Sequence, residues 1–174
     1  YALARNIGEP EPETFYRKLA DQGAYLNSSR PTAVNLSWAI GKMLKTARAH
    51  LAEPRPQLLE ALYRQARAIH LDDIEKCTRI SEYGLSLLHP GDGVLTHCNA
   101  GPLATSRYGT GQGPLLLAAE RGIPLRVFAD ETRPLLQGAR LTSYELQRAG
   151  VDVTLICDNM SATVMRNGWV NAVF

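Results

Sequence analysis

Three short apolar segments in the second half of the chain are each followed directly by residues that could carry out chemistry. These residues are Cys98 after the first segment, Asp130 and Arg133 after the second, and Asp158 after the third. Cysteine thiolates act as nucleophiles or proton-transfer groups, arginines bind phosphate, and carboxylates exchange protons. Because all three segments end in this way, the coincidence is a stronger signal than any single motif.

Cys98 lies in the stretch Thr96-His97-Cys98-Asn99, before a loop that leads to a helix. The carboxyl end of a strand is where ligands bind in open α/β sheets, which favours a catalytic role for this cysteine. The alternative is a small buried hydrophobic side chain, as for most free cysteines. His97 is adjacent, but neighbouring strand residues point to opposite faces, so we expect a structural histidine and no Cys–His pair.

The stretch after the second apolar segment, residues 130–140, concentrates groups suited to a sugar phosphate. Gln137 could bind sugar hydroxyls, Arg133 could bind the phosphate, and Asp130 could transfer protons or hold an arginine. The alternative is a solvated loop with internal ion pairs. Asp158 could likewise support the site, or could be the N-cap of the helix predicted after it.

Two further features could bind phosphate. Gly109, Thr110 and the glycines at 111 and 113 precede a predicted helix, where backbone amides can surround an anion, although such loops also occur as tight turns. The segment is neither a Walker loop nor a convincing dinucleotide fingerprint. Arg30 stands just before another predicted helix, either as a phosphate ligand beside the positive end of the helix dipole or as an ordinary surface arginine.

From residue 91 onward, apolar runs alternate with helical patterns. We predict strands at residues 93–97, 125–129, 151–156 and 170–174, and helices at residues 114–121, 142–149 and 159–165. Short continuous apolar strands separated by helices are typical of a parallel sheet covered on both faces. The predicted fold class is therefore α/β, with a Rossmann-like parallel sheet.

The first half of the chain is predicted to be helical. Apolar residues recur at helical spacing in four segments, residues 13–23, 32–51, 57–70 and 72–88. The turn His89-Pro90-Gly91-Asp92-Gly93 ends the last of them. We therefore expect a helical N-terminal domain at 1–90 and the first part of a Rossmann-like α/β catalytic domain at 91–174.

Composition excludes several classes of protein. The 174 residues carry 19 basic and 17 acidic side chains, a balance that does not indicate a nucleic-acid binder. Three widely spaced cysteines predict free thiols in a reducing compartment, hence the cytoplasm. No apolar run approaches the roughly 18 residues that span a membrane. The four histidines are scattered, without metal-ligand spacing, so we expect no metal site.

Four sequence blocks, taken together, resemble methylthioribose-1-phosphate isomerases. They are SRPTAVNL at residues 29–36, THCNAGPLATSRYGTG at 96–111, ADETRPLLQGARLTSYEL at 129–146 and ICDNMSATVM at 156–165. The match covers nearly the whole chain in the right order. That family is similar in fold to regulatory subunits of a eukaryotic translation-initiation guanine-exchange factor and to archaeal ribose-1,5-bisphosphate isomerases.

The resemblance implies an aldose–ketose isomerase that converts 5-methylthioribose 1-phosphate to 5-methylthioribulose 1-phosphate in methionine salvage, the recycling of an amino acid. It implies a cytoplasmic homodimer without metal or other cofactor. It also implies that Cys98 is catalytic and that Arg30 and Gln137 bind substrate. The family's second catalytic residue, an aspartate in Gly-Ala-Asp-Arg, would follow residue 174, and a substrate-binding Arg-Gly-Ala-Pro-Ala segment would precede residue 1. We therefore expect a chain truncated at both ends.

Three questions stay open at this point. The related substrates ribose 1,5-bisphosphate and 5-deoxyribose 1-phosphate would suit the same scaffold, and the pocket for the 5-substituent decides among them. A non-catalytic regulatory subunit is the other alternative, which the cysteine in THCN argues against. Hydrogen could move between C1 and C2 either as a proton, through an enediol-like state, or as a hydride.

Overall fold

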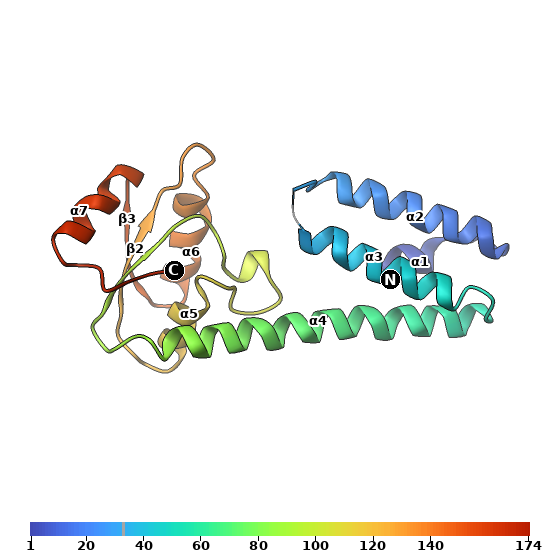
Figure 1. Ribbon diagram of the computed structural model, residues 1–174, viewed down its shortest axis with the longest axis horizontal. Helices are drawn as coiled ribbons and strands as arrows, with labels where there is room; N and C mark the ends of the chain where they lie inside the picture. The colour runs from blue at the N-terminus through green and yellow to red at the C-terminus, as the bar shows by residue number, and fades with distance from the viewer. Residues whose placement is uncertain (33) are drawn as a thin grey trace. The chain divides into compact units, whose positions relative to one another are not determined.

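A computed structural model describes residues 1–32 and 34–174 (Figure 1). The chain forms two compact units, Tyr1–Leu71 and Asp72–Phe174. Helices make up the first unit, and a sheet with covering helices makes up the second. Among the helices of the described residues, none has the length and apolar character required to cross a bilayer.

The first unit is built from α1 (Ala2–Asn6), α2 (Pro12–Ser28), α3 (Val34–Ala49) and the beginning of α4 (Arg55–Leu85). The Glu11 carboxylate starts α2 by accepting the N–H groups of Glu13 and Thr14, and Pro12 suits the first turn. The helices pack around a common apolar core, whose fully buried members include Phe15, Ala47 and Leu62. These contacts give the unit a hydrophobic core of its own.

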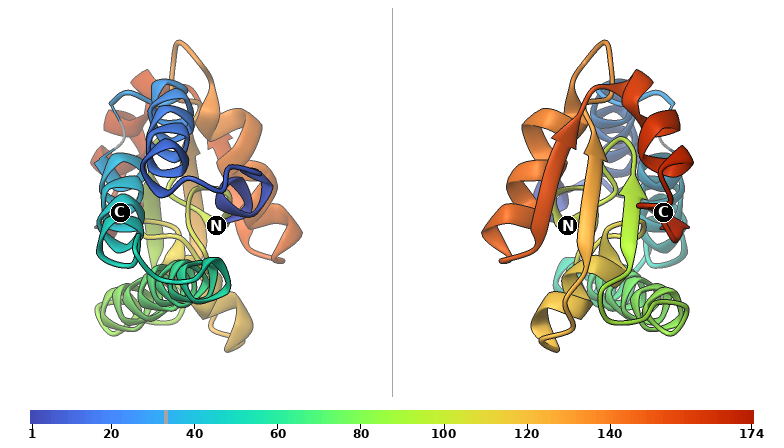
Figure 2. Two further views of the ribbon diagram at one scale, coloured as in Figure 1. Left: turned by 90° about the vertical axis from the view of Figure 1, so that its right-hand side faces the viewer. Right: turned by 90° about the vertical axis from the view of Figure 1, so that its left-hand side faces the viewer.

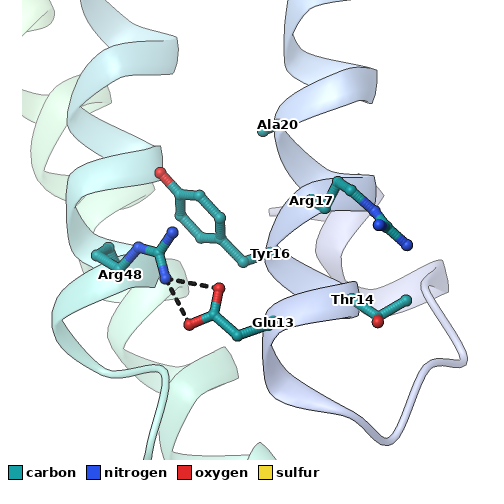
Figure 3. A pocket seen from close by; sticks show the side chains of 6 residues that line it. All are labelled: Glu13, Thr14, Tyr16, Arg17, Ala20 and Arg48. Carbon is teal, nitrogen blue, oxygen red and sulfur yellow. Dashed lines mark hydrogen bonds and ion pairs between the residues drawn. The ribbon is translucent and has the colours of Figure 1, made fainter.

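A small surface pocket of this unit is lined by side chains from α2 and α3 (Figure 3). Two of its charged groups bind each other: Arg48 Nη1 lies 2.7 Å from Glu13 Oε1, and the guanidinium stacks 3.9 Å from the centre of the Tyr16 ring. An exposed ion pair of this kind contributes little to stability. Because Glu13 and Arg48 are already paired with each other, we assign this pocket no ligand.

One continuous helix replaces two predicted ones. We predicted separate helices at residues 57–70 and 72–88, whereas α4 runs unbroken from Arg55 to Leu85. The prediction of a break was wrong because only Leu71 stands between the two apolar patterns, with neither glycine nor proline to end a helix. An ion pair at i,i+4 spacing, Lys76 with Asp72 at 2.7 Å, supports the helix just after this point.

The two compact units divide inside α4, between Leu71 and Asp72. The later part of α4 lies against the sheet unit: a Cβ atom added at Gly113 would meet Ser81 Oγ at 2.2 Å, and one added at Gly84 would meet Pro114. Glycine at these two positions therefore permits the close approach of α4 to α5 (Gly113–Glu120). The domain boundary predicted after residue 90 stays a prediction.

Four parallel strands form the sheet of the second unit, in the order β3-β2-β1-β4. They are β1 (Gly93–Thr96), β2 (Arg126–Asp130), β3 (Asp152–Ile156) and β4 (Ala172–Val173). The chain adds β2 and β3 on one side of β1 and then returns to its other side with β4. This doubly wound order confirms the predicted α/β, Rossmann-like fold class, and it places the topological switch point at the carboxyl ends of β1 and β4.

Helices cover both faces of the sheet (Figure 2). Val94 and Val127 point to one face, where they share a core with α5, α6 (Ser143–Arg148) and Leu85 of α4. The neighbouring residue Leu95 points to the other face, where it packs with Ile156 and Val164 of α7 (Ser161–Arg166). The strands are thus apolar on both sides, as expected for a parallel sheet.

Candidate functional site

Cys98 lies just beyond the carboxyl end of β1, with an exposed side chain. Its φ angle of 65° is in the left-handed region, as is that of Thr132 (63°) after β2. Such a conformation costs a residue other than glycine about 1–3 kcal/mol and persists only where surrounding contacts hold it. The segments after β1 and β2 are therefore held in shape by their neighbours.

The structure brings Cys98 and Gln137 together. Gln137 Nε2 donates a hydrogen bond to Cys98 Sγ at 3.3 Å. The other amide atom, Gln137 Oε1, is buried and has no hydrogen-bond partner within the described part of the chain. Two residues predicted from the sequence thus meet at the switch point, with one acceptor oxygen beside the thiol.

Asp158 holds the segment after β2. Its Oδ1 accepts the Thr132 N–H and its Oδ2 accepts the Arg133 N–H, both at 2.7 Å. The prediction that Asp158 caps its own helix was wrong, because Cys157 and Met160 are the N-caps of the short 3-10 turn Asp158–Met160 and of α7. Sequence spacing alone does not show that a side chain caps a neighbouring loop instead.

These bonds give a testable pH dependence. The Arg133 and Thr132 amides, with the charges of His97 and Arg133, hold the pKa of Asp158 below its usual value. A lowered carboxyl pKa adds stability above the unfolded-state value, near 3.8, and this stability is lost as pH falls through the folded-state pKa. We expect Asp158→Asn to unfold more easily than the parent protein at neutral pH, and the difference to shrink below the ordinary aspartate pKa. Urea denaturation at a series of pH values measures it, and a constant difference would contradict it.

Asp130 is buried at the carboxyl end of β2. Its Oδ2 lies 3.0 Å from His97 Nδ1, and its Oδ1 accepts a hydrogen bond from Ser161 at the start of α7. His97, Asp130 and Asp158 bring potential metal-ligand atoms within 4.8 Å of one another. Because both carboxylates already accept hydrogen bonds from this chain, we assign the cluster to holding the loops, and the expectation of no metal stays a prediction.

The glycine-bearing loop uses its amides internally. Thr110 N–H donates to the Ala100 carbonyl at 2.8 Å, and Gly109 N–H donates to the Arg107 carbonyl at 2.6 Å. Gly109 has a φ of 91°, and a Cβ atom there would meet the Ala100 carbonyl oxygen at 2.2 Å. The glycine is explained by this tight turn, and phosphate binding by Gly109 and Thr110 stays a prediction.

Arg30 belongs to the other compact unit. It is exposed in the turn after α2, where its N–H donates to the Asn27 carbonyl at 3.2 Å. The helix predicted from residue 32 begins at Val34, and residue 33 of the SRPTAVNL block lies outside the described residues. The substrate-binding roles of Arg30 and of the exposed Arg133 stay predictions.

Two threonines that were not predicted as site residues contact Cys98. Thr132 Oγ1 accepts the Cys98 N–H at 2.9 Å, and Thr142 donates its hydroxyl to the Cys98 carbonyl. Thr142 ends a single turn of π-helix, Gly138–Thr142, a feature that is frequent at functional sites. Both threonines lie within the block at 129–146, so that block was the one signal that could have found them.

Comparison with known proteins places this arrangement in a family. A model of the initiation factor 2 subunit family matches residues 1–174, the whole of the chain. The chain belongs to the initiation factor 2 subunit family. Its helical unit and its doubly wound sheet are thus the family's fold.

Curated proteins that are similar to this chain include isomerases by name. A methylthioribose-1-phosphate isomerase of Symbiobacterium thermophilum is 59% identical over 162 residues, which are 93% of this chain and 45% of that protein. A 5-deoxyribose 1-phosphate isomerase of Moorella thermoacetica is 51% identical over 173 residues, 99% of this chain and 49% of that protein. The chain spans about half the length of the curated relatives it matches.

Two solved structures illustrate the likeness of the fold. The 5-methylthioribose 1-phosphate isomerase of Pyrococcus horikoshii OT3 superposes with a TM-score of 0.87 at 36% identity, covering 98% of this chain and 48% of that one. A structure described as translation initiation factor eIF-2B, subunit delta, from A. fulgidus superposes with a TM-score of 0.84 at 42% identity, covering 98% of this chain and 50% of that one.

Proposed function

We propose that the protein containing this chain is an aldose–ketose isomerase that converts 5-methylthioribose 1-phosphate to 5-methylthioribulose 1-phosphate. The observation that carries the proposal is the contact of Cys98 with Gln137 at the switch point of the sheet. The names and identities of the relatives support the same substrate. With it we propose a cytoplasmic homodimer that acts in methionine salvage without a metal or other cofactor.

The reaction needs no oxidant, because hydrogen moves within the sugar. The bond from C1 to the ring oxygen breaks, and that oxygen takes a proton and becomes a hydroxyl. In one route C2 then loses a proton to give an enol, after which C1 gains a proton and the C2 hydroxyl loses its own. In the other route hydrogen moves from C2 to C1 with its electron pair while the C2 hydroxyl loses its proton. Both routes leave a ketone at C2 and the phosphate ester at C1.

Cys98 and Gln137 have complementary tasks in either route. The thiol donates or accepts the proton, or polarises the C2 hydroxyl, and the Gln137 amide fixes its position through the bond to Sγ. The Gln137 side chain as a whole is only partly buried, and we propose that its amide binds a sugar hydroxyl. Turnover in D₂O distinguishes the routes, because proton transfer places solvent deuterium at C1 of the product and a hydride shift does not.

The 51% identical relative favours one alternative, 5-deoxyribose 1-phosphate, which lacks the methylthio group. A pocket that holds one additional apolar group distinguishes such substrates by about 10- to 200-fold. We therefore expect the full-length protein to show a kcat/KM at least about tenfold higher for the methylthio sugar than for the deoxy sugar. Ribose 1,5-bisphosphate belongs in the same assay, because its second phosphate would require additional cations.

The outcomes of this assay separate the proposals. A preference for the deoxy sugar or the bisphosphate moves the assignment to that substrate. Absence of turnover with all three sugars contradicts the enzyme proposal and favours a regulatory subunit, the alternative to which the family description points.

A further inference from the structure

We infer that Thr132 and Thr142 are positioning residues, whose hydroxyl groups hold the Cys98 peptide from both sides so that the thiol meets Gln137. This inference rests on the proposed function. Thr132 Oγ1 accepts the Cys98 N–H, and Thr142 Oγ1 donates to the Cys98 carbonyl. Both polar groups of the Cys98 backbone are thus bound by side chains from the segment after β2.

The neighbours of Thr142 determine the direction in which its hydroxyl proton points. A hydroxyl has one proton and two lone pairs. Asn99 Nδ2 and Gln112 Nε2 donate to Thr142 Oγ1 at 3.1 and 2.9 Å, so both lone pairs are occupied. The proton therefore points to the Cys98 carbonyl, and the fully buried side chain has no solvent partner to exchange for it.

Thr132 is oriented in the same manner. Its hydroxyl donates to the Asp130 carbonyl at 3.2 Å, which leaves a lone pair for the Cys98 N–H. The Asp158 carboxylate holds the Thr132 N–H, so the left-handed conformation of Thr132 is itself fixed from β3. The ends of three strands therefore contribute to the conformation of one cysteine.

The two hydroxyls explain how Cys98 keeps a φ angle of 65°. Without them, the cysteine is free to return to an ordinary extended or helical conformation, which would move Sγ away from Gln137 Nε2. Neither threonine belongs to a strand or to the apolar core of the sheet unit. Removal of the two hydroxyl groups should therefore lower the rate of the reaction at Cys98 Sγ more than the affinity for the sugar.

The test compares Thr142→Val, Thr142→Ser and Thr132→Val in the full-length protein. We expect each valine variant to lower kcat by up to about 100-fold with little change in KM, because the thiol is displaced while the binding groups stay. Serine restores the hydroxyl and should return kcat close to that of the parent protein. Ser81→Ala is the matched control, because it removes another fully buried hydroxyl, bonded to the Cys77 carbonyl, without touching Cys98.

A substrate-free measurement completes the test. The rate at which iodoacetamide alkylates Cys98 is measured by peptide mass spectrometry. The alkylation rate of the exposed Cys157 serves as an internal reference. We expect Cys98 alone to be alkylated several-fold more slowly in the valine variants, because Sγ loses the amide donor that stabilises negative charge on sulfur.

The inference is overturned if folded Thr142→Val and Thr132→Val keep the kcat and the Cys98 alkylation rate of the parent protein. It is also overturned if Thr142→Ser does not restore the kcat lost in Thr142→Val, or if Ser81→Ala loses as much kcat as the valine variants. If the parent shows no turnover, the proposed function fails, and alkylation alone then decides the positioning role.

Discussion

Replacement of Cys98 by alanine in the full-length protein is expected to reduce kcat for 5-methylthioribose 1-phosphate by about 10²- to 10⁴-fold, the usual contribution of a group that transfers a proton. Cys98 is exposed, so the shorter side chain leaves no cavity in the core. Alanine is no less suited than cysteine to a φ angle of 65°. The free energy of unfolding should therefore change by less than about 0.5 kcal/mol. Steady-state kinetics and urea denaturation of the same preparation separate the two effects.

The matched control for this prediction is Cys157→Ala. Cys157 is also exposed and follows β3 at the same edge of the sheet. Its contact with Met160 is made by the backbone, because the Met160 N–H donates to the Cys157 carbonyl. Replacing the Cys157 side chain therefore leaves this bond in place. Its replacement should leave kcat and KM close to those of the parent. Equal activity in the two alanine variants would remove Cys98 from the mechanism and, with it, the observation that carries the proposed function.

The largest expected loss of stability follows the substitution Gly138→Ala. A Cβ atom at this position would lie 1.8 Å from the Asp130 carbonyl oxygen and 2.8 Å from Thr132 Oγ1. The carbonyl cannot move aside easily, because Asp130 ends β2 and pairs with Ile156 of β3. We expect the free energy of unfolding to fall by about 3 kcal/mol or more, since a contact this short forces the backbone to shift.

Gly41→Ala makes the same chemical change where space is available. Gly41 is exposed inside α3, and apart from its chain neighbours and the backbone of its own helix no described atom lies within 4 Å of the position its Cβ would take. Alanine is the better helix former, so stability should rise by about 0.5–1 kcal/mol. Urea denaturation compares the two variants with the parent. Similar midpoints for Gly138→Ala and the parent would contradict the close packing of the π-helical turn on β2.

Much of the sheet unit could be predicted from the sequence because its determinants are local. Apolar runs of four to six residues separated by helical patterns predicted each of the four strands within a few residues of their observed bounds. The positions of Cys98, Asp130 and Asp158 after these strands followed from the same pattern. Parallel strands place their carboxyl ends at one edge of a sheet, so the pattern also predicted that these residues lie at the same edge.

The details that shape the site could not be predicted in this way. The left-handed φ angles of Cys98 and Thr132 depend on bonds between residues far apart in sequence, such as Cys98 with Thr132 and Thr142, separated by 34 and 44 positions. A π-helical turn and the capping of one loop by Asp158 from another strand leave no periodic pattern. Tertiary contacts decide these features, and single-residue propensities do not contain them.

The strand order has a consequence for how the protein is made. The contact between His97 and Asp130 spans 33 positions, whereas the bond from Gly93 N–H to Asn171, at the entry to β4, spans 78. During synthesis, β1, which Cys98 follows, can therefore acquire its β2 neighbour well before β4 emerges from the ribosome. Until then one edge of β1 exposes unpaired backbone groups beside apolar side chains, a template for pairing with other nascent chains.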